Sequence, residues 1–166
     1  MKSVNSRDNP AYKAMHRLVS KSSERKASGM SVLDGAHLVA AFLDSGRTPE
    51  AVMVNGAGAE DPEIIELVRR SAPAPVTQLS DVLFKSLSTV ESPTGIVASV
   101  LTPPSGKVPA DAPLVLLLEN IQDPGNVGTL LRSAAAAGAG HVLLSPQCAF
   151  AWSPNCLLYT SDAADE

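Results

Sequence analysis

The stretch LVLLLENIQDPGNVGTLLRS, residues 114–133, decides how the rest of the chain is interpreted. It begins with an uninterrupted apolar run, 114–118, which is typical of a strand buried on both faces. A polar turn follows, and from Val127 onward apolar residues recur at helical spacing. The stretch therefore predicts a strand over 114–118 and a helix over 126–137, joined by a loop with Asn126 at the helix N-cap.

The same alternation of short apolar runs and helical patterns extends in both directions. Residues 141–144 (HVLL) form a further strand candidate, which completes a right-handed βαβ unit. Upstream, the pattern predicts an α/β domain of roughly 90 residues. Its predicted strands are 30–33, 51–54, 76–79 and 96–101; its predicted helices are 10–22, one capped by Asp34, one opened by Asp61-Pro62, and one capped by Ser80 or Asp81 and ending at Leu87.

A composition shift separates these two parts. Residues 102–112 (TPPSGKVPADA) hold three prolines and one glycine, which indicates an extended linker. We expect a first domain over 1–102, a linker over 103–112, and the start of a second domain over 113–155. Residues 156–166 (CLLYTSDAADE) are short and acidic, and we expect them to be a non-native tail.

Charge is distributed unevenly along the chain. The formal net charge is −4, yet residues 1–28 carry seven Lys or Arg against two acidic residues, a formal +5 that leaves −9 for the remainder. A basic leader on an acidic body indicates an anionic partner, although a solvated helix face explains the same pattern. The candidate phosphate contacts are Arg7, Lys13, Arg17, Lys21, Arg25 and Lys26.

Several classes of protein are disfavoured. Cys148 and Cys156 form neither a CxxC motif nor a Cys/His cluster, so we expect no metal site. Residues 1–12 are polar and resemble no signal peptide, and no apolar run approaches the length of a membrane span. We therefore expect a cytoplasmic protein that binds no membrane and keeps its thiols free.

The loop of the 114–133 stretch is the strongest candidate for chemistry. It runs from the carboxyl end of a strand to a helix N-terminus, where α/β sheets bind ligands and where backbone N–H groups favour an anion. Gly125 and Gly128 allow close approach, and the guanidinium of Arg132 offers a planar fork to phosphate. Taken singly, Asn126 and Arg132 are also explained as a cap and a solvated side chain. The loop carries neither G-x-G-x-x-G nor GxxxxGK[ST], so Rossmann and P-loop sites fit poorly.

At this level of detail the residues resemble a known family. The stretch is similar to the first signature motif of the SpoU/TrmH RNA ribose 2'-O-methyltransferases, which belong to the SPOUT (trefoil-knot) superfamily. The likeness extends upstream to that family's L30e-like substrate-binding domain and covers about residues 5–154. The matching positions are Asn120-x-x-Asp123-Pro124-x-Asn126-x-Gly128-x-x-x-Arg132-Ser133-Ala134, together with Ser6-Arg7-Asp8-Asn9-Pro10, Leu33-Asp34-Gly35-x-His37 and Pro93-Thr94-Gly95.

The resemblance implies an L30e-like α/β domain followed by the first βαβ unit of an incomplete SPOUT domain. It implies methyl transfer from S-adenosylmethionine to a ribose 2'-hydroxyl of ribosomal or transfer RNA, with Arg132 and Asn126 as catalytic residues. It also implies that the full-length protein is a homodimer. The residues that would bind S-adenosylmethionine are not identified, because the family places them in later motifs that we expect to be missing. The 166-residue chain is therefore expected to be inactive by itself.

Two alternatives remain open at this point. One is an L30e-like RNA-binding module without catalysis, for which the basic residues of 1–28 would suffice. The other is a nucleotide-binding α/β protein of a different type. The pair Asn126 and Arg132 favours the enzyme, since a pure binding module has no need of it.

Overall fold

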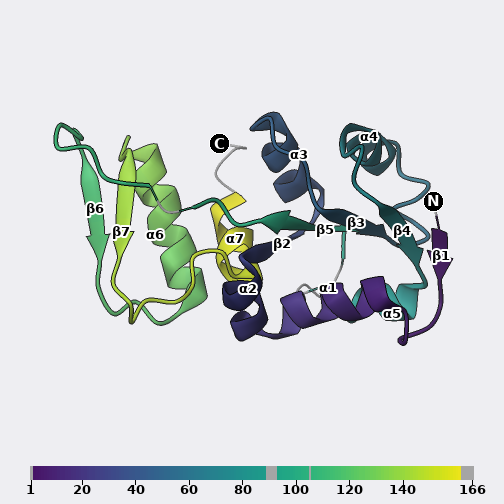
Figure 1. Ribbon diagram of the computed structural model, residues 1–166. Helices are drawn as coiled ribbons and strands as arrows, with labels where there is room; N and C mark the ends of the chain where they lie inside the picture. Colours follow the sequence, from purple (N-terminus) through teal and green to yellow (C-terminus); the bar gives the residue numbers. More distant parts are fainter. Residues whose placement is uncertain (1, 89–92, 105, 162–166) are drawn as a thin grey trace. The chain divides into compact units, whose positions relative to one another are not determined.

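The computed structural model describes residues 2–88, 93–104 and 106–161, with the side chains of residues 2 and 158–161 left out (Figure 1). The chain divides into two compact units, Met1–Thr102 and Pro103–Glu166, called here the N-terminal and C-terminal units. The described elements are β1 (Lys2–Val4), α1 (Pro10–Ser20), α2 (Ser22–Ser28), β2 (Met30–Asp34), α3 (Ala36–Asp44), β3 (Ala51–Val54), α4 (Pro62–Arg70), β4 (Val76–Leu79), α5 (Asp81–Lys85), β5 (Ile96–Leu101), β6 (Val115–Leu118), α6 (Pro124–Ala136), β7 (His141–Leu144) and α7 (Pro154–Ser161).

The N-terminal unit is a five-stranded mixed sheet with helices on both faces. The strand order is β1-β4-β3-β5-β2. The pairs β1–β4 and β4–β3 are parallel, whereas β5 runs antiparallel to both β3 and β2. Figure 1 shows α3 and α4 on one side of the sheet and α1 and α5 on the other. The predicted α/β class is therefore confirmed.

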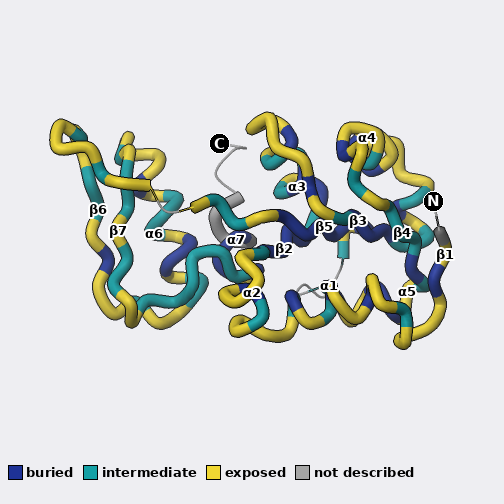
Figure 2. The backbone as a smooth tube through the Cα atoms, viewed as in Figure 1, coloured by how far each residue is buried: buried dark blue, intermediate teal, exposed yellow. Residues whose placement is uncertain are grey.

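Burial in this sheet follows from its two covered faces. Every residue from Ile96 to Val100 is buried, and so is every residue from Val52 to Val54. Both runs belong to central strands, which are dark blue in Figure 2. Strands covered on both sides need continuous apolar sequence rather than alternation, and Val and Ile provide it here without many aromatic side chains.

Helix α1 forms because capping and periodicity agree. The Asn9 side chain accepts hydrogen bonds from the N–H groups of Ala11 and Tyr12, and Pro10 opens the helix. Tyr12, Met15 and Leu18 lie on the buried face, and Lys13 and Arg17 lie on the exposed face. The prediction of one helix over 10–22 was too long.

The sequence pattern did not predict two elements of the N-terminal unit, helix α2 and strand β1. The helical geometry is interrupted at Lys21, and the chain then forms α2, although we expected only a turn in this segment. Gly29 follows the last residue of α2 as its C-cap, in the left-handed region (φ 64°). Strand β1 pairs with β4 through its backbone, and of its residues only Val4 is a buried apolar one. A three-residue edge strand carries no periodic signal, which is why the sequence pattern missed it.

Asp34 does not cap α3. It is the last residue of β2, and its carboxylate accepts a hydrogen bond from the Ser88 hydroxyl at 2.9 Å. The N-cap position is taken by Gly35, whose φ of 113° and N–H bond to the Ile96 carbonyl form a sharp turn directly after the strand. A side chain at that φ would be strained, so the turn selects glycine over a capping residue.

A second glycine is required where two backbones cross. A Cβ on Gly58 would lie 2.3 Å from the carbonyl oxygen of Gly95, which is far inside van der Waals contact. The Asn55 side chain holds this loop by accepting a hydrogen bond from the Gly58 N–H at 2.7 Å. The loop after β3 is thus pinned against the residues that lead into β5.

The C-terminal unit contains the predicted βαβ arrangement. Strands β6 and β7 are parallel, with Leu118 opposite Leu144 and Leu117 opposite Leu143. Leu118 is buried, whereas Leu117 is 67% exposed and Leu143 is 44% exposed. One face of the pair is therefore covered and the other presents leucine to solvent. Helix α7 includes the first residues of the expected non-native tail, and two of these, Cys156 and Leu157, are buried.

Candidate active site

The candidate site is built on the connection between β6 and α6. Strand β6 ends at Leu118, and the chain then turns through Asn120. Among the described residues, Asn120 is the one non-glycine residue with a positive φ (56°). The Asn120 side chain accepts a hydrogen bond from the Gln122 amide at 3.1 Å. Asparagine tolerates the left-handed region better than most residues, so this position turns the chain toward the helix without glycine.

Helix α6 begins at Pro124 and is capped by Asp123, not by Asn126. The Asp123 carboxylate accepts a hydrogen bond from the Asn126 N–H at 2.8 Å. The prediction of a helix starting at Asn126, with that residue as cap, is therefore wrong. Because Asp123 performs the capping, the Asn126 side chain is exposed in the first turn and makes no hydrogen bond with described residues.

Arg132 lies further along the same helix. Its side chain is partly exposed and has neither a hydrogen bond nor an ion pair among the described residues. Side chains on a helix lean toward its N-terminus, and the residue one turn back is the buried Gly128, which has no side chain to obstruct it. The guanidinium can therefore approach the first turn, where Asn126 lies. No ion pair joins Arg132 to Glu119 in the described part of the chain.

The loop after β7 is fastened to this connection. The Ser145 N–H donates to the Leu118 carbonyl at 2.9 Å, and the Ser145 hydroxyl accepts from the Asn120 N–H at 3.1 Å. The Ala149 N–H donates to the Ile121 carbonyl at 2.7 Å. The two loops at the carboxyl ends of β6 and β7 thus form one hydrogen-bonded platform. Sequence reasoning singled out neither Ser145 nor this linkage, since it joins segments distant in the chain.

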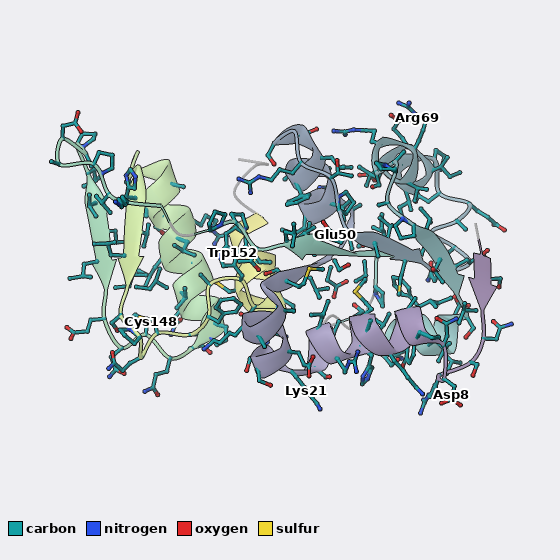
Figure 3. All side chains as sticks on the ribbon, in the orientation of Figure 1. Asp8, Lys21, Glu50, Arg69, Cys148 and Trp152 are labelled. Carbon is teal, nitrogen blue, oxygen red and sulfur yellow. The ribbon has the colours of Figure 1, made fainter. Side chains whose placement is uncertain are left out.

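Cys148 belongs to the same platform, and Figure 3 shows it beside the ends of β6 and β7. Its sulfur accepts from the Ile121 N–H at 3.4 Å and donates to the Leu118 carbonyl at 3.3 Å. Desolvation alone would raise the pKa of Cys148, but hydrogen bonds from the Ile121 N–H, from Ser145 and from the Asn120 N–H outweigh it and lower the pKa. Cys156 is fully buried on α7, and desolvation raises its pKa to about 11.

The basic residues of the N-terminal unit are not equivalent. Arg7, Lys13 and Arg17 line one cavity of about 450 Å³ on α1, together with Tyr12 and His16. Lys21 and Lys26 are exposed but do not line that cavity. The structure thus brings three of the six predicted phosphate contacts together.

Arg25 is the exception, and its assignment as a phosphate contact is wrong. The residue is only 6% exposed, and one guanidinium nitrogen donates to the carbonyls of Leu18 and Val19 near the end of α1. These are carbonyls that a helix C-terminus leaves without partners, and a positive charge is favoured there. Desolvation lowers the pKa of Arg25. Arg25 therefore ties α2 to α1 instead of facing solvent.

The described residues contain neither a candidate metal site nor a candidate membrane span. Within the described ranges, no three His, Cys, Asp or Glu side chains are grouped so that they could hold a metal ion. No described helix is both long and apolar enough to cross a membrane.

Two parts of the chain match the sequence models of known protein families. The sequence model of the MRM3-like substrate binding domain matches residues 9–98, more than half of the chain, and that of the SpoU rRNA methylase family matches residues 113–166. The chain belongs to the family of the MRM3-like substrate binding domain, and its residues 113–166 match the SpoU rRNA methylase family. The second match includes the β6–α6 connection, and the resemblance seen in the sequence is confirmed.

Individual relatives agree with this assignment. The chain is 34% identical over 148 residues to the mitochondrial rRNA methyltransferase 3 of Mus musculus, covering 80% of this chain and 33% of the mouse protein. It is 32% identical over 157 residues to the 23S rRNA (guanosine(2553)-2'-O)-methyltransferase RlmP of Bacillus subtilis, covering 95% of this chain and 60% of that protein. The chain thus spans about a third of the length of the mouse relative and three fifths of the length of the Bacillus subtilis relative.

A solved structure shares the fold of this chain. The AdoMet-bound rRNA methyltransferase from Sinorhizobium meliloti superposes with a TM-score of 0.79 at 22% identity, covering 98% of this chain and 60% of that protein. At this identity the likeness concerns the fold.

One groove of the C-terminal unit does not by itself fit S-adenosylmethionine. That molecule carries an adenine, a ribose, a sulfonium and a charged amino-acid group, and each needs a polar or oppositely charged partner. A groove of about 460 Å³ in the C-terminal unit is lined by side chains that include no charged group. They are Leu131, Val142, Leu144, Ala151, Trp152 and Leu157. Trp152, which is labelled in Figure 3, is the residue of this lining with a polar side-chain group, and that group is a single N–H donor.

Proposed function

We propose that this chain supplies the substrate-binding domain and the ribose-facing part of an RNA ribose 2'-O-methyltransferase. The observation that carries the proposal is the first turn of α6, where Asp123 takes over capping and leaves the Asn126 amide unoccupied, with the unpaired Arg132 on the same helix. The methyl donor proposed for the whole protein is S-adenosylmethionine, and the proposed substrate is ribosomal RNA, in line with the names of the similar proteins.

Arg132 and Asn126 suit a ribose hydroxyl for a physical reason. A sugar hydroxyl is a weak nucleophile, and its oxygen gains negative charge as its proton leaves. A guanidinium stays protonated in water, so Arg132 stabilises that developing charge and holds an adjacent phosphate. The Asn126 amide can donate to one sugar oxygen and accept from another, which fixes the orientation of the ribose. We assign both residues to positioning and electrostatic stabilisation, not to proton abstraction.

The remaining expectations about the whole protein also belong to the proposal. They are the homodimer, a cytoplasmic location and the absence of methyl transfer by the 166-residue chain alone. The last is supported by the poor fit of one apolar groove of the C-terminal unit to the methyl donor. The non-catalytic alternative, an L30e-like RNA-binding module, is less well supported, because it leaves the arrangement at Asn126 and Arg132 without a role.

Two measurements test the proposal. In the first, residues 1–150 are fused to the part of the Bacillus subtilis relative that follows the residue aligned with position 150, and tritiated methyl transfer to ribosomal RNA is measured. We expect label in alkali-resistant ribose-methylated dinucleotides from the fusion and none from the 166-residue chain. Label in the bases would overturn the proposal.

The second measurement needs no fusion. Fluorescence anisotropy follows the binding of the unaltered chain to a ribosomal RNA fragment over a range of salt concentrations. We expect binding that weakens steeply with salt, as phosphate contacts require. Absence of binding at low salt would contradict the proposal whether or not the fusion folds.

A further inference from the structure

The cavity on α1 combines size, charge and ring surfaces in one place. Its volume of about 450 Å³ falls within the roughly 300–1,000 Å³ typical of small-ligand sites. Helix α1 supplies most of its wall, and the residues before that helix and after α5 supply the rest. The lining residues are Arg7, Tyr12, Lys13, His16, Arg17 and Ser86.

The charges around this cavity are strongly one-sided. Three cationic side chains line it, and the nearby Asp8 carboxylate pairs with one of them, Lys13, at 2.7 Å. Arg7 and Arg17 have no hydrogen bond or ion pair with described residues, so their guanidinium groups remain available. In Figure 3, a row of side chains along the stretch from Asp8 to Lys21 projects from α1 on the side away from the sheet. The cavity therefore favours an anion that arrives from solvent.

The ring wall of the cavity is held in place. The Ser86 hydroxyl donates to the Leu83 carbonyl at 2.6 Å, so the Tyr12 hydroxyl, 2.7 Å from Ser86, is the donor in that second bond. Tyr12 is 5% exposed and packs in the core, and the His16 ring lies against it with centroids 5.7 Å apart. Tyr12 thus supports His16, and His16 is the ring that a ligand would meet.

We propose that this cavity binds one unpaired nucleotide of the RNA substrate, with its phosphate held by Arg7, Lys13 and Arg17 and its base against His16. The inference rests on the proposed function and deepens it. A base in an A-form duplex is stacked between neighbours and cannot enter a cavity, whereas a base in a loop or bulge is free to do so. Stacking on a ring together with phosphate contacts is the usual way proteins hold single-stranded nucleic acid.

Binding measurements on the full chain test this site. The probe is a fluorescein-labelled, unstructured RNA of about 12 nucleotides, compared with the same sequence in a duplex. We expect Arg7→Ala/Arg17→Ala to weaken single-strand binding about tenfold at low salt and to reduce the slope of log K against log salt by about 1.4. Arg47→Ala, which removes an exposed charge of the same unit outside the cavity, should leave the slope nearly unchanged.

The base contact has its own variant. His16→Ala should weaken binding of the single strand while leaving binding of the duplex unchanged, because a duplex offers no free base. Equal losses for both probes would overturn the nucleotide site. Thermal unfolding of each variant identifies losses caused by misfolding, and photo-crosslinking of the unaltered chain with thiouridine RNA gives a result that needs no variant. Crosslinks in the peptide that contains residues 12–17 are expected, and crosslinks confined to other peptides would contradict the proposal.

Competition separates RNA from smaller anions with the same chemistry. We expect the RNA to be displaced by unlabelled RNA at micromolar concentration and by uridine monophosphate or inorganic phosphate only at millimolar concentration. Tighter binding of the mononucleotide than of the RNA would assign the cavity to a free nucleotide instead. If the cavity variants bind RNA normally while the fusion methylates ribose, this inference fails and the proposed function stands.

Discussion

The carboxylate of Asp123 lies 2.8 Å from the backbone nitrogen of Asn126 and accepts its hydrogen bond. This contact fixes where α6 begins and which side chain of the first turn remains free. Replacing Asp123 with Ala should reduce the free energy of unfolding of the C-terminal unit by about 1 kcal/mol, because one helix N–H group loses its partner. Urea denaturation followed by circular dichroism measures the change.

A matched cap provides the control. Asp61 caps α4 in the same way, accepting from the Glu63 N–H at 2.8 Å, so Asp61→Ala should destabilise the N-terminal unit by a similar amount. Asp123→Asn should retain most of the stability. If Asp123→Ala unfolds at the same urea concentration as the unaltered chain, the assignment of the cap is wrong.

Arg132 and Asn126 should separate catalysis from binding in the fusion protein. Arg132→Lys keeps the charge but loses the planar fork, and we expect it to lower methyl transfer by about 10²-fold or more, the usual loss on removing one stabilising donor. Asn126→Ala should lower it less, and both variants should weaken RNA binding in anisotropy titrations far less than they lower methyl transfer. Normal methyl transfer by Arg132→Lys would remove the residue from the site.

Arg25 should behave as a structural residue. Arg25→Met keeps much of the apolar stem but removes the donor to the Leu18 and Val19 carbonyls, so we expect a loss of about 1–3 kcal/mol in the free energy of unfolding. The salt dependence of RNA binding should match that of the unaltered chain at temperatures where the variant is folded. A reduced salt slope would restore Arg25 as a phosphate contact.

The two thiols should react at different rates. Cys148 has a lowered pKa and is partly exposed, whereas Cys156 is fully buried with its pKa raised to about 11. With Ellman's reagent near neutral pH we expect one fast equivalent, which Cys148→Ser abolishes, and a second equivalent only on unfolding.

The raised pKa also predicts a pH effect on stability. The folded state holds the Cys156 proton more tightly than the unfolded state, so its contribution to stability is complete below the ordinary pKa of 9.0 and is lost as pH rises toward about 11. The unaltered chain should therefore lose more stability than Cys156→Ala between these pH values. Equal losses would contradict the raised pKa.

Leu117 and Leu143 should drive self-association. They are register partners and lie side by side on the uncovered face of β6 and β7, where their exposed fractions are 67% and 44%. Replacing both with Thr should reduce self-association in sedimentation velocity while leaving the unfolding midpoint nearly unchanged. Ile65→Thr removes an isolated exposed apolar residue from α4 and should leave the association state as it was.

The sequence predicted most of the fold because local signals and tertiary burial agree there. The continuous apolar run before Glu119 and the helical spacing after Val127 each have a single interpretation, and β6 and α6 follow them. Asp123 and Asn126 are both good capping residues three positions apart, so local sequence could not decide between them. Strand β1 and helix α2 were missed because the stability of each depends on a neighbouring element rather than on its own pattern.

The sequence by itself determined the α/β class, the β6–α6 connection and the residue types at the candidate site, because periodicity and capping are encoded within a few positions. Only the tertiary structure decided that Arg25 is buried, that Asn126 is free, and that Arg7, Lys13 and Arg17 share a cavity with His16. These facts depend on which surfaces meet when distant segments pack, and a charge pattern along the chain does not show whether a side chain faces carbonyl groups or solvent.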